Sequence, residues 1–186
     1  YVRGEGCGLL VLKRLSDATR DGNSVLALIR GTAINQDGRS QGLTAPNGPA
    51  QERVIRRALA VSGLQPVDID TIEAHGTGTK LGDPVEINGL KSAFDGVSGE
   101  RRCGLGSVKT NIGHLELAAG VAGVIKVLLQ MKHRTLVRSL HCEQVNPYID
   151  LSGSPFYLVD QNTPWQALTD TDGRTLPRRA GVSSFG

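Results

Sequence analysis

Two histidines stand on glycine-rich segments, and their types and spacing are the strongest sign of chemistry in this chain. His75 lies in Glu73-Ala-His-Gly-Thr-Gly-Thr79, and His114 ends the segment Lys109-Thr-Asn-Ile-Gly-His114. Glycine lets the backbone turn tightly and approach a ligand closely. About thirty residues separate the two segments, roughly the length of a strand-helix-strand unit, which brings both turns to the same edge of a sheet. We therefore expect the two imidazoles to share one active site.

His114 comes directly before a long apolar segment that we expect to be a helix. At a helix N-terminus the unpaired N–H groups and the positive end of the dipole disfavour an imidazolium, so the ring should stay neutral near pH 7. A neutral imidazole can donate one N–H to a developing oxyanion without carrying charge. The alternative for His114 is a side chain that only caps its turn. For His75 the alternative is a glycine-rich turn with an incidental histidine.

Lys109 precedes His114 by five residues on the same predicted loop. From there it could orient a carboxylate or form an ion pair with one of three acidic residues: Glu73, Glu86 or Glu116. The alternative is a solvated surface lysine, and both interpretations stay open at this point.

Other glycine-rich or histidine-containing segments fit known ligand sites poorly. Gly76-Thr-Gly-Thr-Lys80 and Gly106-Ser-Val-Lys-Thr110 lack the spacing of a P-loop, and Gly4-Glu-Gly-Cys-Gly8 lacks the dinucleotide fingerprint. His133 and His141 have no carboxylate or thiol at ligand spacing. The sequence therefore favours neither a nucleotide site nor a metal site.

The cysteines and serines offer no convincing nucleophile. Cys7 lies in a tight glycine-rich turn and Cys103 follows two arginines that would favour a thiolate, yet inert structural thiols are the favoured interpretation. No serine stands in a Gly-x-Ser-x-Gly elbow, since Gly181-Val-Ser-Ser-Phe-Gly186 has the wrong spacing. The chain thus holds candidate oxyanion donors without a matching nucleophile.

The composition is that of an ordinary protein with enough chain for one domain and a substantial core. Its 186 residues are 39% hydrophobic and 21% charged, and the formal net charge is +3. Only 4% are aromatic and no long run of one charge sign occurs, so we expect no nucleic acid partner; a mildly acidic protein partner fits better. Three cysteines without disulfide or metal-ligand spacing favour a reducing compartment, the cytoplasm. The longest apolar run, 115–129, carries charges and is too short to span a membrane.

Alternating strands and helices must position the two turns. The hydrophobic patterns predict strands at 8–15, 25–33, 68–74, 104–108, 156–159 and 179–184, and helices at 49–62, 83–94 and 115–132. A polar turn is expected at 16–24 and a long loop, favoured as functional, at 35–47. This alternation indicates an α/β layer structure in one unit.

The three predicted helices differ in their ends and faces. The helix at 49–62 starts at a proline and turns its arginines outward. The helix at 83–94 has Asp83 as its expected N-cap and Glu86 as the reciprocal residue of a capping box. The helix at 115–132 is apolar nearly all round, so we expect it to lie buried between other layers.

Several segments, taken together, closely resemble the ketosynthase domain of modular type I polyketide synthases. They are Tyr1-Val-Arg-Gly-Glu-Gly-Cys-Gly8 with Val11-Leu-Lys-Arg-Leu15, Gly31-Thr-Ala-Ile-Asn-Gln-Asp-Gly38, Thr44-Ala-Pro-Asn-Gly48, Glu73-Ala-His-Gly-Thr-Gly-Thr79, Gly82-Asp-Pro-Val-Glu86, Lys109-Thr-Asn-Ile-Gly-His114 and Gly181-Val-Ser-Ser-Phe-Gly186. The similarity covers essentially the whole chain, and the motifs occur in the family's order.

The resemblance implies an α/β thiolase-like fold of five layers, α-β-α-β-α, built from two similar halves. Residues 1–20 would end the N-terminal half of a β-ketoacyl synthase domain, and residues 21–186 would form most of the C-terminal half. The implied activity is decarboxylative Claisen condensation of an acyl chain with a malonyl-type unit on acyl carrier protein. The resemblance implies no cofactor bound by the domain itself, since substrates arrive on the phosphopantetheine of the carrier.

Residue roles follow from the same motif match. His75 and His114 would hydrogen-bond the malonyl thioester oxygen as the carboxylate leaves, and Lys109 would support His114. Thr77 and Thr79 would contact the phosphopantetheine arm. The nucleophilic cysteine of the family belongs upstream of these residues and is not among them.

Both ends of the sequence look cut, so we expect a piece of a longer chain that is inactive alone. The implied partners are acyl carrier protein, the missing N-terminal half and, in the full domain, a second copy as a homodimer. Two alternatives stay open: a non-catalytic scaffold half that complements a partner carrying the cysteine, and fatty-acid rather than polyketide elongation.

Overall fold

A four-stranded parallel sheet forms the centre of the computed structural model, which describes residues 1–40, 42, 45–97, 103–170 and 172–185. Its strands lie in the order β4 (Phe156–Leu158), β2 (Cys103–Gly106), β1 (Thr71–Glu73) and β6 (Ala180–Val182). Every neighbouring pair is parallel, and Glu73 lies opposite both Gly106 and Val182. The four strands predicted in these regions are confirmed. Their carboxyl ends meet at one edge, which is where ligands bind in open α/β sheets.

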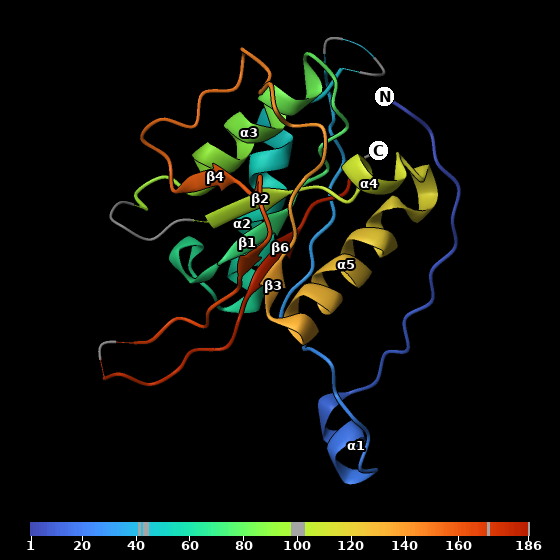
Figure 1. Ribbon diagram of the computed structural model, residues 1–186, viewed down its shortest axis with the longest axis vertical. Coiled ribbons are helices and arrows are strands. Elements are labelled where there is room, and N and C mark those ends of the chain that lie inside the picture. Colours follow the sequence, from blue (N-terminus) through green and yellow to red (C-terminus); the bar gives the residue numbers. More distant parts are fainter. Residues whose placement is uncertain (41, 43–44, 98–102, 171, 186) are drawn as a thin grey trace.

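Helices cover both faces of this sheet (Figure 1). α2 (Gly48–Ser62) and α3 (Gly82–Ala93) pack together over one face, and α5 (Ala119–His133) crosses the other. β1 and β2 are buried almost throughout, as expected for parallel strands covered on both sides. The largest fully buried side chains, Leu90, Leu105 and Phe156, place the main core between the sheet and α3.

The ends of α2 follow from its sequence. The Asn47 side chain accepts the N–H of Ala50 at 3.2 Å, and Gly63 ends the helix with a φ of 68°. An amide N-cap, a proline in the first turn and a left-handed glycine are ordinary start and stop signals. The helix predicted at 49–62 is confirmed. Its arginines are exposed as expected: Arg53, Arg56 and Arg57.

The capping box predicted for the helix at 83–94 is wrong. The N-cap of α3 is Leu81, which makes no side-chain cap. The carboxylates of Asp83 and Glu86 instead accept backbone N–H groups of the preceding turn, residues 75–78. Buried backbone N–H groups need hydrogen-bond acceptors. Because the N–H groups of this turn bind the two carboxylates, these side chains do not cap the start of α3.

α5 follows a short 3-10 turn, η2 (Glu116–Ala118), and rests with one face on the sheet. Its buried residues are Ala119, Gly123, Lys126, Val127 and Gln130. The opposite side lines an open groove of about 680 Å³ whose walls include Leu115, Val121 and Ile125. The prediction of a helix buried between two layers therefore holds for one side only, because within the described residues the sheet covers one side of α5.

Two predicted strands do not form. Residues 8–15 and 25–33 are largely extended, but among the described residues neither pairs with a strand. Strand backbone needs a neighbour for its N–H and C=O groups, and no strand of the described chain lies beside these segments. Several of their apolar side chains are consequently exposed, including Leu9, Val11 and Ile29. Figure 1 shows the first segment running along the outside of α5, away from the sheet.

The glycines near the N-terminus have a packing role. A Cβ on Gly4 would come 2.3 Å from the carbonyl oxygen of Ile112, and one on Gly6 would come 2.4 Å from the Leu115 side chain. Only glycine permits so close an approach of backbone to the segment around α5. The Gly-x-Gly-x-Gly pattern therefore allows the first residues of the chain to pack directly against Ile112 and Leu115.

Some short elements escaped prediction because two to six residues show no clear periodicity. They are α1 (Leu15–Arg20), which starts at the end of the predicted strand 8–15 and continues into the predicted turn at 16–24, η1 (Pro66–Asp68), α4 (Lys109–Ile112), and the antiparallel pair β3 (Thr135–Leu136) and β5 (Thr163–Pro164). In α1, Asp17 and Arg20 form an ion pair at 2.8 Å that suits the helix dipole, so the polar segment closes one helical turn.

Residues 35–47 contain no helix or strand where they are described, as predicted, and residues 41, 43 and 44 of that loop lie outside the described residues. In the described part of the chain, every helix is too short or too polar to cross a membrane.

Candidate active site

Three segments that follow neighbouring strands bring His75, His114 and Phe185 together. His75 comes two residues after β1, His114 lies beyond β2 and α4, and Phe185 follows β6. The imidazoles of His75 and His114 meet edge to face with their centroids 5.4 Å apart. Phe185 packs against His75 at 5.6 Å. The structure thus brings together the two histidines that the sequence assigned to one site.

Each imidazole accepts a backbone N–H at Nδ1. The N–H of Phe185 donates to His75 Nδ1 at 3.3 Å, and the N–H of Glu116 donates to His114 Nδ1 at 2.9 Å. A nitrogen that accepts a hydrogen bond carries no proton, so each neutral ring holds its proton on Nε2. His114 also caps its own turn through this bond. The capping role and a donor role use different nitrogens of the ring and are compatible.

Burial and positive charge favour the neutral form of both rings. Burial lowers the pKa of His75 to about 4, and nearby Lys109 and His114 act in the same direction. The pKa of His114 is also lowered, first by burial and then by Lys109, while Glu116 opposes the shift. Both bases are therefore mostly uncharged at pH 7. Each residue presents an Nε2–H donor without an imidazolium charge.

Glu86 holds the backbone of the His75 turn. Its two carboxylate oxygens accept the N–H groups of His75 and Gly76 at 2.7 and 2.8 Å. Burial raises the pKa of Glu86 to about 7, against the lowering effect of these two bonds. Gly76 has a φ of 48°, and a Cβ there would come 2.9 Å from the Ser107 side chain. The turn that carries His75 thus depends on a glycine and on a buried carboxylate from α3.

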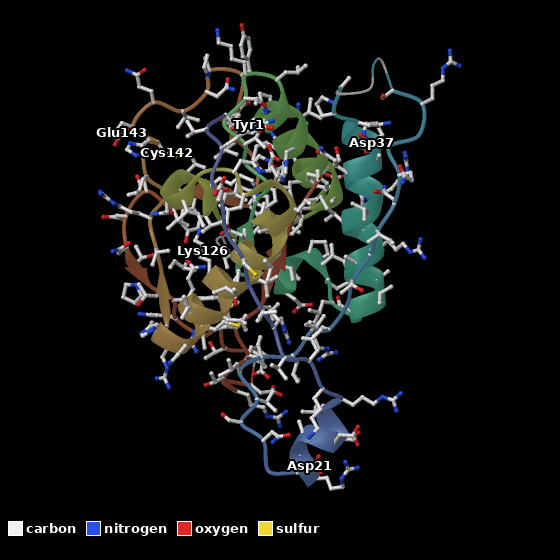
Figure 2. The ribbon with its side chains drawn as sticks, turned by 90° about the vertical axis from the view of Figure 1, so that its right-hand side faces the viewer. Tyr1, Asp21, Asp37, Lys126, Cys142 and Glu143 are labelled. Atoms are coloured by element: carbon white, nitrogen blue, oxygen red, sulfur yellow. The ribbon has the colours of Figure 1, made fainter. Side chains whose placement is uncertain are left out.

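Glu73 and Lys126 form a buried ion pair beneath the site. Lys126 Nζ lies 2.6 Å from Glu73 Oε2, and the two side chains are 9% and 3% exposed. The other carboxylate oxygen, Oε1, accepts the N–H of Val108, which immediately precedes α4. Figure 2 shows Lys126 projecting from α5 in the middle of the molecule.

The first four residues fix the backbone of His114. The N–H of His114 donates to the Val2 carbonyl at 2.8 Å, and the N–H of Gly4 donates to the His114 carbonyl at 3.0 Å. The Tyr1 ring lies 4.7 Å from the His114 ring. Sequence reasoning missed these contacts because nothing in the pattern links residues more than a hundred positions apart.

Three acidic residues were candidate ion-pair partners of Lys109, and one of them has another partner. Glu116 pairs with Arg3 instead, with Glu116 Oε1 and Arg3 Nε 2.9 Å apart. Lys109 lies half-buried near the carboxylates of Glu86 and Glu73, which raise its pKa, but burial lowers that pKa more. Because Lys109 is half-buried and lies near buried carboxylates, it is not a freely solvated surface lysine.

Thr77 and Thr79 follow His75 in the same turn. Their hydroxyl oxygens lie 3.2 Å apart, and Thr79 Oγ1 also accepts the N–H of Gly82 at 3.1 Å. The Thr79 hydroxyl therefore helps to begin α3. Both threonines are half-buried at the carboxyl edge of the sheet, beside the two histidines.

The family comparison bears directly on this arrangement. The family described as "Beta-ketoacyl synthase, C-terminal domain" matches residues 26–143, more than half of the chain and both histidine turns. This chain belongs to the β-ketoacyl synthase family. Its curated relatives are polyketide synthases. It is 58% identical over its full length to polyketide synthase PksN of Bacillus subtilis, and 53% identical to erythronolide synthase EryA2 of Saccharopolyspora erythraea. The chain spans only 4% and 5% of those two proteins.

Solved ketosynthase structures share the fold. The oxazolomycin ketosynthase domain OzmH KS7 of a Streptomyces is 51% identical with a TM-score of 0.91, and the match covers 94% of this chain and 31% of that one. The ketosynthase from module 6 of the bacillaene synthase of Bacillus subtilis is 44% identical with a TM-score of 0.86, covering 94% of this chain and 31% of that one. The fold is therefore thiolase-like, as the sequence predicted.

The three cysteines of this ketosynthase segment differ in their exposure. Cys103 is buried in β2, and Cys7 is exposed on the N-terminal segment. Burial raises the pKa of Cys142, as do Glu143 and Asp83, which disfavours a thiolate. Figure 2 shows Cys142 and Glu143 together on an outer loop. In the part of the chain that the structure describes, no group of three metal-binding side chains gathers.

Proposed function

We propose that this segment supplies the decarboxylation half of a ketosynthase active site that extends acyl chains with malonyl-type units. The observation that carries the proposal is the pair of neutral imidazoles, whose rings meet at 5.4 Å and whose protons lie on Nε2. Decarboxylation of a malonyl thioester places negative charge on the thioester oxygen. Preorganised neutral donors aimed at such an oxygen are an effective form of transition-state stabilisation.

The proposed reaction begins with decarboxylation. The bond between the malonyl carboxylate carbon and the α-carbon breaks, carbon dioxide leaves, and the electron pair becomes an enolate whose oxygen accepts the Nε2–H groups of His75 and His114. The α-carbon of the enolate then attacks an acyl thioester on a cysteine, a new carbon–carbon bond forms, and the cysteine thiolate leaves. Neither histidine needs to give up its proton in this sequence, which suits rings that are neutral at pH 7.

The cysteine of this reaction would come from the part of a ketosynthase that precedes residues 1–20, the end of its N-terminal half. Residues 21–186 would then be most of the C-terminal half. The apolar groove along α5 and the unpaired segments 8–15 and 25–33 support this proposal, because each leaves apolar surface for another layer to cover. The expected homodimer of the full domain belongs to the same proposal.

Acyl carrier protein is the proposed donor of both substrates, through its phosphopantetheine arm. Thr77 and Thr79 offer hydroxyls for the arm beside His75, and Lys109 would support His114 by its charge. The curated relatives are polyketide synthases, so we propose polyketide rather than fatty-acid elongation. A non-catalytic scaffold half is less well supported, because a scaffold has no need of two protonated Nε2 donors in contact.

The test measures release of carbon dioxide from malonyl acyl carrier protein by a complete ketosynthase that contains these 186 residues. His75→Ala and His114→Ala should each lower the rate by roughly 10²- to 10³-fold, since each removes one oxyanion donor. His133→Gln, which changes an exposed histidine at the far end of α5, serves as the matched control and should keep the rate. Full decarboxylation in either alanine variant would contradict the proposal.

A further inference from the structure

Glu73 links the strand that precedes His75 to the segments on both sides of His114. It is the last residue of β1, two positions before His75. Its Oε1 accepts the N–H of Val108, and its Oε2 binds Lys126 on α5 at 2.6 Å. Val108 is the N-cap of α4, and His114 lies between α4 and η2, just ahead of α5. One carboxylate therefore joins the strand before His75 to the helices on both sides of His114.

Two glycines leave room for this ion pair. A Cβ on Gly123 of α5 would come 3.1 Å from Glu73 Cγ, tighter than ordinary contact. A Cβ on Gly106 would come 3.2 Å from Lys126 Nζ. An ion pair enclosed this closely has little freedom to move, so its geometry is transmitted to the backbone that it touches.

We propose that Glu73 is a positioning residue for His114, with Lys126 as the counter-charge that keeps its carboxylate in place. By accepting the N–H of Val108, Glu73 sets where α4 begins and thereby where His114 stands relative to His75. This inference rests on the proposed decarboxylation. Glu73 itself contacts neither substrate nor the histidine rings, and its effect passes through the backbone.

The charges around Glu73 explain why the lysine is needed. Burial raises the pKa of Glu73, whereas Lys126, the Val108 N–H and the more distant Lys109 lower it. Without Lys126, Lys109 on α4 is the positive side chain among the described residues that still lowers the pKa of Glu73. Glu73 would then take up a proton at higher pH and accept the Val108 N–H less strongly.

The decisive comparison uses two double variants of the complete ketosynthase: Glu73→Gln with Lys126→Met, and Glu73→Ala with Lys126→Met. Both remove the two charges, but only glutamine keeps an oxygen that can accept the Val108 N–H. We expect the glutamine variant to decarboxylate within about tenfold of the wild type, and the alanine variant to lose about 10²-fold in kcat with little change in KM, because displacing a reacting group by an ångström costs about that much. Equal rates in the two variants would overturn the proposal.

A pH profile gives a readout that a merely structural role would not move. In the single variant Lys126→Met, kcat should fall as pH decreases, over a range in which the wild type stays flat, because Glu73 becomes protonated there. A flat pH profile of the Lys126→Met variant would also overturn the proposal. If a double variant fails to fold, this pH profile serves as the test of the proposal. The matched control removes the ion pair between Asp68 and Arg179, 2.8 Å apart, and should leave the profile unchanged.

The two proposals fail in different ways. If His75→Ala or His114→Ala keeps full decarboxylation, the proposed function is wrong whatever the Glu73 variants do. If both histidine variants lose activity while the two double variants match each other, the function stands and only the role of Glu73 is wrong.

Discussion

The carboxylate of Glu86, on helix α3, accepts the backbone N–H of His75 at 2.7 Å. A second bond from the neighbouring N–H of Gly76 makes the contact bidentate. A side chain eleven positions further along the chain therefore fixes the turn on which the proposed donor stands. Rigid support of this kind is what a preorganised oxyanion site requires.

Replacing Glu86 by glutamine should weaken that support. One of the two oxygens becomes an NH₂ group, which faces a backbone N–H and cannot accept its hydrogen bond. We expect decarboxylation of malonyl acyl carrier protein by the complete ketosynthase to fall by roughly 10- to 100-fold, mainly in kcat. Glu52→Gln, whose carboxylate pairs with Arg56 on α2, is the control. A Glu86→Gln variant with wild-type kcat would show that the turn needs no such support.

Glu86 should also make stability depend on pH. Its pKa is raised from 4.5 to about 7 by burial, so the folded protein binds this proton more tightly than the unfolded chain does. Its contribution to the free energy of unfolding is complete below about pH 4.5 and is lost as the pH rises through about 7. Urea unfolding of wild type and Glu86→Gln across this range measures the effect. The difference in stability between the two proteins should change with pH, and a constant difference would contradict the raised pKa.

Gly76→Ala should be costlier than an ordinary glycine substitution. The new Cβ would meet the Ser107 side chain at 2.9 Å in a backbone conformation that L-residues rarely adopt. Gly63→Ala is the matched control, since Gly63 also has a positive φ, 68°, but a Cβ there would meet open space. We expect about 1 kcal/mol of destabilisation for the control and several times that for Gly76→Ala. Equal midpoints in thermal unfolding would show that the contact with Ser107 relaxes freely.

Lys109→Met should raise the pKa of both histidines. The positive charge of Lys109 lowers both values, so its removal makes each imidazole more basic. The acidic limb of the pH–rate profile should therefore move to higher pH, because each ring gains charge sooner as the pH falls. Lys132→Met, at the exposed end of α5, should leave the limb in place. A limb that does not move would show that Lys109 acts on neither ring.

Much of this arrangement could be predicted because it depends on local signals. α2 is signalled by the cap before it, the proline in its first turn and the glycine after it. The apolar runs of β1 and β2 are likewise signals within a few neighbouring residues. The spacing of the two histidine turns predicts that they lie at the same edge of the sheet, because a strand-helix-strand unit has a characteristic length.

The failures come from partners that lie outside the few neighbouring residues that a local pattern covers. Glu86 resembles a capping residue, yet its carboxylate is taken by a turn that precedes the helix. The contacts of Val2 and Gly4 with His114, and the bond from Phe185 to His75, join positions more than a hundred residues apart. The segment at 8–15 has the apolar pattern of a strand, but a strand forms only where another strand can pair with it.

The proposed chemistry needs His75 and His114 both to be neutral donors with their protons on Nε2. Nitrogen NMR of the complete ketosynthase with ¹⁵N-labelled histidine, assigned through the two alanine variants, measures tautomer and charge directly. At pH 7 we expect both rings to be neutral with the proton on Nε2, and His75 to titrate with a pKa of about 4. A proton on Nδ1 of either ring, or an imidazolium at either position at pH 7, would contradict the proposed role of the two histidines.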